Sequence, residues 1–335
     1  MFLPGFAGVT FEYLDRSLKD ILEFDDNLFG GMFVLLGGDF RQTLPVSPKS
    51  TRAGIISLSL PNSYLWPAFR VFKLHRNMRL LTNDIDYGGS TPTVDFAKWL
   101  LDVGNGIIGV TIPDYLLIPY GDNSLQHLIS FVYDRKILAH PSANDLPVRA
   151  IVCPTNDVAD KINTLILQMT DSDEVTYRST DAMQPNGKHT LELEGLYPIE
   201  FLNGLNFSGI PAHALTLKIN TPIMLLRNIN QREGLCNGTR LIVSQLLPNI
   251  IEATIITGTS IGNRVYIPWI KFIHNPADLP FAFSRKQFPI KVCYVITINK
   301  SQGQSLKRIG VYLSQPVLHM VNFRLHCPGQ HLFPH

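Results

Sequence analysis

The chain has 335 residues, of which 45% are hydrophobic and 17% charged, a composition typical of a globular protein of two or three domains and not of a disordered one. Its net charge is only +2, so a nucleic-acid-binding surface would need basic residues gathered locally. No apolar run approaches the roughly 20 residues of a membrane span, so the sequence disfavours a membrane protein. The four cysteines form no Cys-x-x-Cys pair, which disfavours a zinc site and a disulfide framework and fits a reducing compartment.

The first predicted element is an amphipathic helix over residues 11–24. Its predicted apolar face consists of Phe11, Leu14, Leu18, Ile21 and Leu22. Its predicted polar face consists of Asp15, Arg16, Lys19 and Asp20. The pair Gly30-Gly31 then breaks the chain. The apolar run of residues 33–36 that follows predicts a short buried strand.

A polar loop comes directly after this strand, at the position where the working groups of open α/β sheets lie. The loop contains Gly38, Asp39, Arg41 and Gln42. Gln42 both donates and accepts hydrogen bonds, so it suits a phosphate oxygen or an attacking water. On the residues alone, a strand that ends in an ordinary polar turn is the simpler interpretation, and both interpretations stay open at this point.

The middle of the chain alternates between predicted strands and helices. Residues 71–74 predict a strand, and amphipathic helices follow over 94–103 and 125–133. The apolar run 148–153 predicts another strand, which leads through Thr155 and Asn156 into a helix. These two residues either cap the helix or contact a phosphate at its N-terminus, and the cap is the favoured role.

From about residue 197 the pattern changes to short strands separated by turn residues. The predicted strands are 215–219, 223–226, 241–243, 250–257 and 265–270. Strands of this length and spacing suggest a small β-barrel. Within it, Asn237-Gly238-Thr239 is either a plain hairpin turn or a close approach to a backbone phosphate.

The last predicted elements return to a buried sheet. Residues 288–296 predict a buried strand that runs into a strand-to-helix turn. Lys300 and Ser301 lie at this turn, where a cation and a hydroxyl can hold a single-strand phosphate. Residues 309–313 predict one more strand.

Three stretches resemble helicase motifs of the Pif-type DNA helicases, most closely those of the branch carried by Helitron transposons. Gly-Gly-Asp-Phe-Arg-Gln at residues 37–42 resembles the third motif, Asn-Met-Arg at 77–79 the fourth, and Thr-Ile-Asn-Lys-Ser-Gln-Gly-Gln-Ser-Leu at 297–306 the fifth. The sequence between residues 201 and 241 resembles the 2B insertion of that family, and the whole resemblance covers roughly residues 3–318.

This resemblance implies an α/β fold of the P-loop NTPase type. It comprises part of a first RecA-like domain, followed by a second RecA-like domain with an inserted small SH3-like β-barrel, the 2B domain. The implied boundaries are 1–75 for the first domain, 76–195 and 276–318 for the second, 196–275 for the barrel and 319–335 for a divergent tail.

The resemblance also implies ATP and Mg²⁺ as cofactors and single-stranded DNA as the partner. Asp39, Gln42 and Arg79 would act at the γ-phosphate, with a plain surface arginine as the alternative for Arg79. The implied nucleotide-facing residues are Gly38, Arg41, Gln302 and Gly303. The implied DNA-binding residues are Thr155, Asn237, Gly238, Asn299, Lys300 and Ser301. No residue of this chain is predicted to hold a metal ion.

Three parts of the family pattern are missing from the sequence. The single Gly-Lys pair, Gly187-Lys188, lacks the first glycine and the hydroxyl residue of a P-loop. The metal-binding acid pair would fall at Met1 and Phe2, and residues 320–335 do not resemble the sixth motif. Their three histidines fit a disordered tail better than a metal site. Because hydrolysis depends on many groups at once, we expect negligible ATPase and unwinding from this chain alone.

Three hypotheses follow: a fragment of a Helitron-type 5′–3′ DNA helicase, a non-catalytic single-stranded-DNA-binding module, and the product of a decayed transposon. The first carries the family's roles in DNA repair, recombination, telomere maintenance and transposon replication. It also implies the missing helicase parts as partners if these are expressed separately, and no membrane partner. The nucleus is the expected compartment, with the mitochondrion as the family's alternative.

Overall fold

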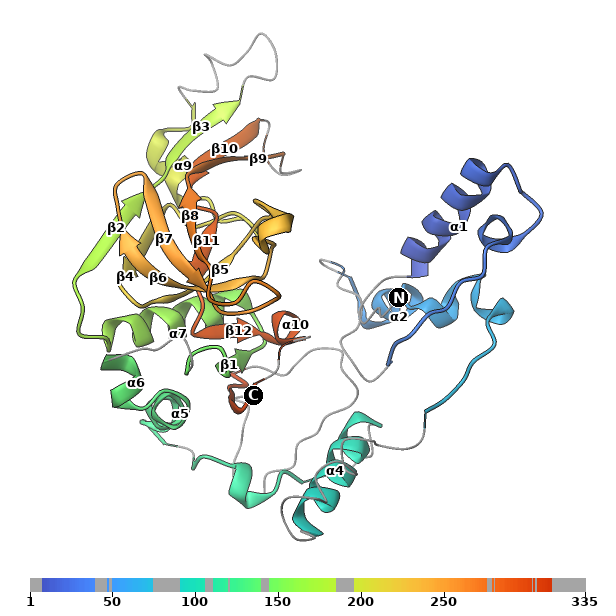
Figure 1. The fold of residues 1–335 in the computed structure, drawn as a ribbon, viewed down its shortest axis with the longest axis horizontal. Helices are drawn as coiled ribbons and strands as arrows, with labels where there is room; N and C mark the ends of the chain where they lie inside the picture. Colours follow the sequence, from blue (N-terminus) through green and yellow to red (C-terminus); the bar gives the residue numbers. More distant parts are fainter. Residues whose placement is uncertain are drawn as a thin grey trace. The chain divides into compact units, whose positions relative to one another are not determined.

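The computed structural model describes residues 8–39, 47, 50–74, 91–105, 111–119, 121–139, 145–184, 196–275, 279, 281–302, 304 and 306–314. The chain divides into two compact units, unit 1 with residues 1–117 and 316–335, and unit 2 with residues 118–315 (Figure 1). Within the described ranges, every helix is too short or too polar to cross a membrane.

Unit 1 consists of helices and connecting segments, and residues 11–69 contain a small apolar core. Its elements are α1 (Gly8–Leu22), η1 (Leu28–Gly31), α2 (Arg52–Ser57), η2 (Leu60–Asn62), η3 (Trp66–Ala68), α4 (Thr91–Gly104) and η5 (Asp114–Leu116). Phe11, Phe29 and Leu65 form the buried centre, and Val34 and Leu36 pack against it. The helix predicted over 94–103 is confirmed as α4, where Phe96 and Trp99 stack at 5.6 Å between ring centroids.

The buried strand predicted over residues 33–36 is wrong. The segment is extended but belongs to no sheet in the part of the chain that the structure describes, and Phe33 and Leu35 are 105% and 83% exposed. Only one side of the segment, Val34 and Leu36, faces the core. Alternate residues of an extended segment point to opposite sides, so Val34 and Leu36 pack against the core whereas Phe33 and Leu35 lie on the exposed side.

The helix predicted over 11–24 is confirmed as α1, but its predicted faces are right only in part, because Phe11 is buried and Leu18 packs against the same core while other residues depart from the prediction. Leu14, Ile21 and Leu22 are exposed, whereas Asp15 is fully buried. The physical reason is that Asp15 finds donors from outside the helix, so its carboxylate is satisfied where an unpaired one would be expelled.

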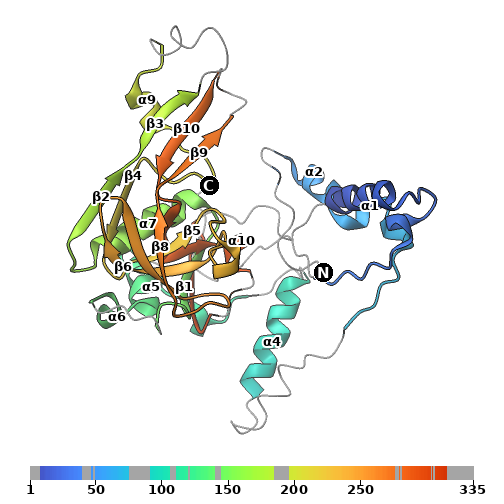
Figure 2. The ribbon, with the colours of Figure 1, turned by 45° about the horizontal axis from the view of Figure 1, so that its top comes forward.

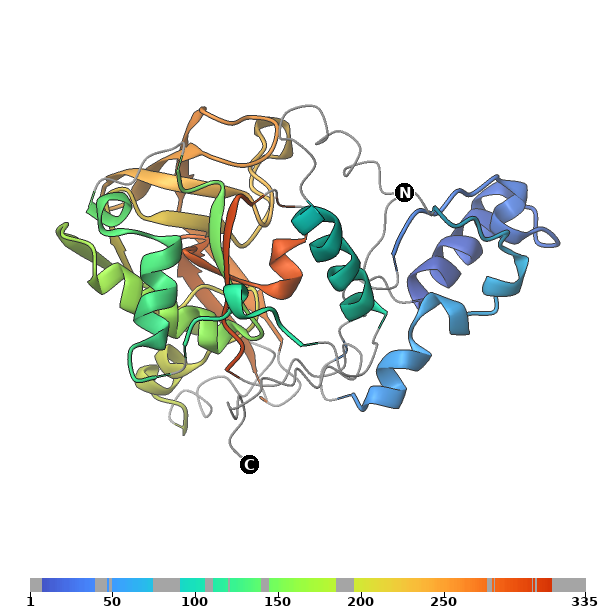
Figure 3. The same cartoon turned by 90° about the horizontal axis from the view of Figure 1, so that it is seen from below.

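Unit 2 contains a parallel sheet in the order β12-β1-β13, made of β1 (Arg149–Cys153), β12 (Val295–Thr297) and β13 (Arg308–Val311). The helices α5 (Ser124–Val132), α6 (Arg135–Ala139) and α7 (Asn156–Gln168) belong to the same region, and Figure 3 shows the unit from their side, in green. The strands and helices predicted over 125–133, 148–153 and 309–313 are confirmed within a few residues. Ile151 and Cys153 share one core cluster with residues of all three helices.

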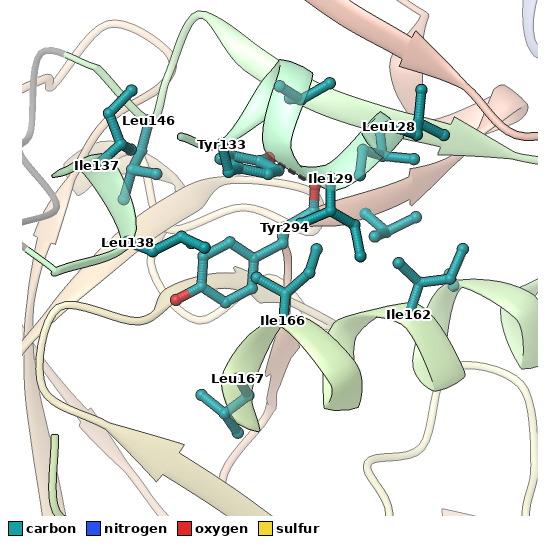
Figure 4. Packing of buried hydrophobic residues seen from close by; sticks show 14 of the residues in the cluster. Leu128, Ile129, Tyr133, Ile137, Leu138, Leu146, Ile162, Ile166, Leu167 and Tyr294 are labelled. Carbon is teal, nitrogen blue, oxygen red and sulfur yellow. Dashed lines mark hydrogen bonds between the residues drawn. The ribbon is translucent and has the colours of Figure 1, made fainter. Parts of the chain in front are cut away.

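Figure 4 shows that this core gathers around two tyrosines. The hydroxyl of Tyr133 donates to the carbonyl of Tyr294 over 2.6 Å, and the two rings meet edge to face at 5.5 Å. The labelled aliphatic side chains around them are Leu128, Ile129, Ile137, Leu138, Leu146, Ile162, Ile166 and Leu167. The opposite face of the parallel sheet packs Ala150 and Val152 against Met224 of the antiparallel strands.

The antiparallel part of unit 2 confirms the prediction of several short strands (Figure 2). One sheet has the order β11-β5-β6-β7-β8, with β5 (Pro222–Leu225), β6 (Arg240–Leu246), β7 (Ile250–Ile255), β8 (Arg264–Pro268) and β11 (Ile290–Val292). β2 (Glu174–Arg178) pairs with β4 (Ala214–Lys218). A third sheet has the order β3-β10-β9, with β3 (Thr180–Gln184), β10 (Ala282–Gln287) and β9 (Ile270–His274). The helices α9 (Ile199–Gly204) and η6 (Gln231–Glu233) lie between strands in the chain.

The strand predicted over 288–296 is divided in two. β11 pairs antiparallel with β5, whereas β12 pairs parallel with β1. Cys293 and Tyr294 lie between them and carry the chain from one sheet to the other. The amide of Cys293 donates to the carbonyl of Pro222 over 2.8 Å, so the antiparallel sheet and the parallel sheet are joined through a continuous piece of backbone.

Candidate nucleic-acid interface

The short helix α10 (Ile298–Ser301) begins at the carboxyl end of β12, as the strand-to-helix prediction requires. The buried side chain of Asn163, on α7, accepts from the amides of Tyr294 and Val295 at 2.9 Å each and so fixes the start of β12. Ser301 donates to the carbonyl of Ile298 over 2.7 Å. These local bonds leave Asn299 and Lys300 on the exposed side of the turn.

The structure brings Asn237 to Lys300 although 63 residues separate them. The ammonium of Lys300 donates to Asn237 Oδ1 over 3.4 Å. Two hydrogen bonds fix the Asn237 turn. The backbone amide of Asn237 donates to Asn228 Oδ1 over 2.7 Å, and the backbone amide of Gly238 donates to the carbonyl of Leu225 over 2.9 Å. Gly238 has φ +90°, the left-handed region that a side chain disfavours.

Sequence reasoning missed a second cation beside this pair. Lys291, on β11, donates to Asn156 Oδ1 over 3.3 Å. Asn156 is the first residue of α7, and Thr155 caps that helix by accepting from the Val158 amide at 3.4 Å, so the favoured capping role is confirmed. The signal for Lys291 was present, since it is the one charged residue in the apolar stretch 288–296.

The two lysines influence each other electrostatically. Partial desolvation, and then the positive charge of Lys291, lower the pKa of Lys300. Burial raises the pKa of Asp160, against the opposing effect of Lys291. Each ammonium group donates to the side-chain oxygen of an asparagine, which carries no charge, and the effect of Lys291 on Lys300 shows that two like charges lie close together. A phosphodiester would relieve this repulsion, because it offers anionic acceptors to both lysines and to the asparagine amides.

Arg240 fixes the turn that carries Asn237, a role that no pattern in the sequence indicates. Its side chain is 0% exposed at the start of β6, three residues after Asn237. The guanidinium donates to the carbonyls of Pro147 at 3.2 Å, Leu146 and Arg149 at 3.3 Å each, and Cys293 at 3.4 Å. All four carbonyls lie next to or within the parallel-sheet region. Arg240 therefore ties the antiparallel sheet to the body that carries Lys300, through hydrogen bonds to neutral groups.

In unit 1 a buried carboxylate organises the segment before Gly38 and Asp39. Asp15 accepts from the Phe29 amide, from the Tyr64 hydroxyl at 2.8 Å and from Lys19 at 3.0 Å. Burial alone would raise the pKa of Asp15, but these hydrogen bonds outweigh it and hold that pKa below its ordinary value. The bond to Phe29 ties α1 to η1, and η1 leads into residues 32–39.

The nucleotide-facing part of the predicted site is only partly described. Arg41, Gln42, Arg79 and Gly303 lie outside the described residues. Gly38 and Asp39 belong to unit 1, whereas Gln302 belongs to unit 2. The residues predicted to contact DNA all belong to unit 2, and among them the structure joins Lys300 to Asn237 by a hydrogen bond; they are Thr155, Asn237, Gly238, Asn299, Lys300 and Ser301.

Two family models match the chain. One, described as PIF1-like helicase, matches residues 6–111, and the other, described as DNA helicase Pif1, 2B domain, matches residues 200–246. The ATP-dependent DNA helicase Pif1 of Bdellovibrio bacteriovorus is 25% identical over 313 residues, which are 93% of this chain and 58% of that protein. The ATP-dependent DNA helicase PIF1 of Danio rerio is 26% identical over 113 residues, which are 30% of this chain and 16% of that protein.

Solved structures share the fold. The Pif1 helicase from Bacteroides in complex with ADP-AlF3 and ssDNA has a TM-score of 0.58 at 20% identity, over 92% of this chain and 62% of that one. The Pif1 helicase from Candida albicans has a TM-score of 0.55 at 19% identity, over 92% of this chain and 65% of that one. These likenesses confirm the predicted α/β class with RecA-like parts and a 2B domain. The chain spans less than two thirds of each of these proteins.

Proposed function

We propose, from the relation of this chain to the Pif1-type DNA helicases, that it is the DNA-holding part of an ATP-dependent DNA helicase and binds the backbone of single-stranded DNA itself. The observation that carries the proposal is the pair Lys291 and Lys300, each hydrogen-bonded to an asparagine from a different part of unit 2. Two cations and two amides on one surface are the groups that contact phosphates without reading sequence.

The relatives support the choice of ligand. Those matched in sequence are named ATP-dependent DNA helicases, and one solved relative holds ssDNA together with ADP-AlF3. In this chain Thr155, Asn237, Gly238, Asn299, Lys300 and Ser301 are the proposed DNA-binding residues, and Lys291 and Asn156 join them from the geometry. The proposed path of the strand crosses from the parallel-sheet region to the Asn237 turn.

For the nucleotide, we propose that the chain supplies groups to a γ-phosphate but does not hold ATP and Mg²⁺ unaided. Asp39, Gln42 and Arg79 would act at the γ-phosphate, and Gly38, Arg41, Gln302 and Gly303 would line the nucleotide. The 335 residues contain no G-x-x-x-x-G-K-[ST] stretch to cradle the phosphates. We therefore expect ATP hydrolysis only when a separate polypeptide supplies the missing phosphate-binding groups. The expected compartment is the nucleus, and the expected roles are the family's roles in DNA repair and recombination.

The test measures binding of a fluorescent single-stranded oligonucleotide by anisotropy over a series of salt concentrations. We expect Lys300→Ala and Lys291→Ala each to weaken binding about tenfold and to lower the salt slope by about 0.7. Lys136→Ala, an exposed lysine on α6, is the matched control and should bind as the unchanged chain does. Equal binding by all four proteins would refute this site, and ATPase turnover of the single chain would refute the expected inactivity.

An ATPase assay beside the binding assay separates the second hypothesis, a non-catalytic DNA-binding module, from the first. That hypothesis predicts the same loss in Lys300→Ala but no gain of ATP hydrolysis when an intact P-loop segment from a Pif1-type helicase is supplied. A gain of DNA-stimulated hydrolysis would favour the helicase fragment.

A further inference from the structure

Arg227 lies in the segment after β5 that holds the Asn237 turn. On one side of it in the chain, the carbonyl of Leu225 accepts from the Gly238 amide over 2.9 Å. On the other side, Asn228 Oδ1 accepts from the Asn237 amide over 2.7 Å. Because both flanking hydrogen bonds end on the same turn, Arg227 is fixed beside the part of the barrel that meets α10.

The guanidinium of Arg227 covers an aromatic ring from a distant strand. Its Cζ lies over the ring of Phe272, on β9, 4.9 Å from the ring centroid. Phe272 is 0% exposed, whereas Arg227 is exposed, so the guanidinium is the outer member of the pair. The ring attracts the cation and limits its rotamers before any ligand binds. Arg227 therefore presents a flat, oriented cation to solvent.

The charge of Arg227 is not neutralised by a carboxylate. Among the residues that the structure describes, its side chain has the ring contact but no ion pair or hydrogen bond. The buried Arg285 is the opposite case, since its guanidinium is held by Asp181 and by backbone carbonyls. The donors and the outer face of the Arg227 guanidinium can therefore meet a ligand from solvent.

A nucleobase is the ligand that this arrangement fits. Proteins that hold single strands combine cations along the backbone with flat side chains on which bases stack, and guanidinium planes serve this purpose as aromatic rings do. The proposed single-strand site has the cations but no aromatic side chain. Its residues are Thr155, Asn156, Asn237, Gly238, Lys291, Asn299, Lys300 and Ser301. Arg227 on Phe272 supplies the missing stacking surface next to Asn237.

We propose that a base of the bound single strand stacks on the outer face of Arg227, so that the Phe272 ring, the guanidinium and the base form three layers. This inference rests on the proposed function, because Lys291 and Lys300 must hold the strand that brings the base to Arg227. The contact accepts any of the four bases, since each has a π-face. The chain therefore prefers a strand with bases over a bare sugar-phosphate chain.

The test measures binding of two fluorescent single strands of equal length to the full chain by anisotropy. One is oligothymidylate, and the other is the same sugar-phosphate backbone made of abasic tetrahydrofuran units. The unchanged chain should bind oligothymidylate about tenfold more tightly, the effect expected of one stacked base. Arg227→Lys should reduce this preference to about twofold or less and leave the salt slope unchanged, because lysine keeps the charge but has no planar face.

Arg308→Lys is the matched control. Arg308 is also an exposed arginine over a ring, with its Cζ 5.3 Å from the centroid of Phe131. It begins β13 and pairs with Arg149 at the start of β1, so it lies at the amino end of the parallel sheet. The proposed single-strand site lies at the other end, because α10 follows the carboxyl end of β12. This variant should keep the full preference for oligothymidylate.

The outcomes separate this inference from the proposed function. Equal affinity of the unchanged chain for both strands, or a full preference in Arg227→Lys, would overturn base stacking. So would a reduced salt slope with an unchanged preference in Arg227→Ala, because it would assign Arg227 to a phosphate. If Lys300→Ala weakens both strands while Arg227→Lys keeps its preference, only the base contact is overturned. If the unchanged chain binds neither strand, both conclusions are overturned. A melting curve of each variant verifies the fold.

Discussion

Replacing Arg285 by methionine should destabilise unit 2 strongly, because it leaves a buried carboxylate without its cation. Both Arg285 and Asp181 are fully buried, and the pair is joined at 2.7 Å. Without the guanidinium, Asp181 retains the Ser179 hydroxyl at 2.7 Å and His213 at 3.7 Å. Breaking a buried pair by removing one partner costs about 3–5 kcal/mol, a large part of the roughly 5–15 kcal/mol that stabilises a typical domain.

The reverse substitution should cost less, and the difference is the sharper test. Asp181→Leu leaves Arg285 with its three backbone acceptors, at 3.0, 3.2 and 3.3 Å. We therefore expect a loss smaller than that of Arg285→Met by about 1–2 kcal/mol, the value of one or two hydrogen bonds. The double variant should lose less than the sum of the two, because no buried carboxylate remains unpaired.

The measurement is urea unfolding followed by circular dichroism, with Arg264→Met as the matched control. Arg264 forms an ion pair with Glu252 at 3.8 Å, but its side chain is 77% exposed, so its loss should cost less than about 1 kcal/mol. A loss in Arg285→Met no greater than that of the control, or strict additivity in the double variant, would refute the reasoning that a buried, mutually dependent pair anchors the β3-β10-β9 sheet.

Two further predictions concern the positioning of the sites. Arg240→Lys should weaken single-strand binding about as much as Asn237→Ala, because one ammonium cannot reach the four carbonyls that Arg240 contacts. The variant that combines both substitutions should bind no more weakly than either single variant. If the two losses of affinity measured by anisotropy add, Arg240 does not act by positioning Asn237. In unit 1, Asp15 has a lowered pKa, so its contribution to stability is present above the unfolded value of about 4 and is lost as the pH falls below it. Hydrogen exchange at the Phe29 amide, corrected for its intrinsic rate, should therefore accelerate in acid; Asp15→Asn should remove this pH dependence, and its persistence there would assign the effect to another group.

Local patterns in the sequence were sufficient for most elements of unit 2. The apolar spacing in 125–133, the alternation in 215–219 and 250–257, and the turn at Asn237-Gly238 all depend on neighbours within a few residues, and each is confirmed within two residues at its ends. The motif at 297–306 likewise placed Lys300 at a strand-to-helix turn because strand, turn and helix are consecutive there.

Only the tertiary structure decided which residues far apart in the chain contact one another. Lys291 meets Asn156 across 135 residues, Lys300 meets Asn237 across 63, and Arg240 reaches Leu146 across 94. Asp15 is buried because Tyr64 and Phe29 supply donors from outside its helix, which no helical periodicity can reveal. The amino-acid sequence by itself determined most elements of unit 2 and the family resemblance. The pairing of sheets determined which polar side chains share a surface, because register places residues opposite one another regardless of their distance along the chain.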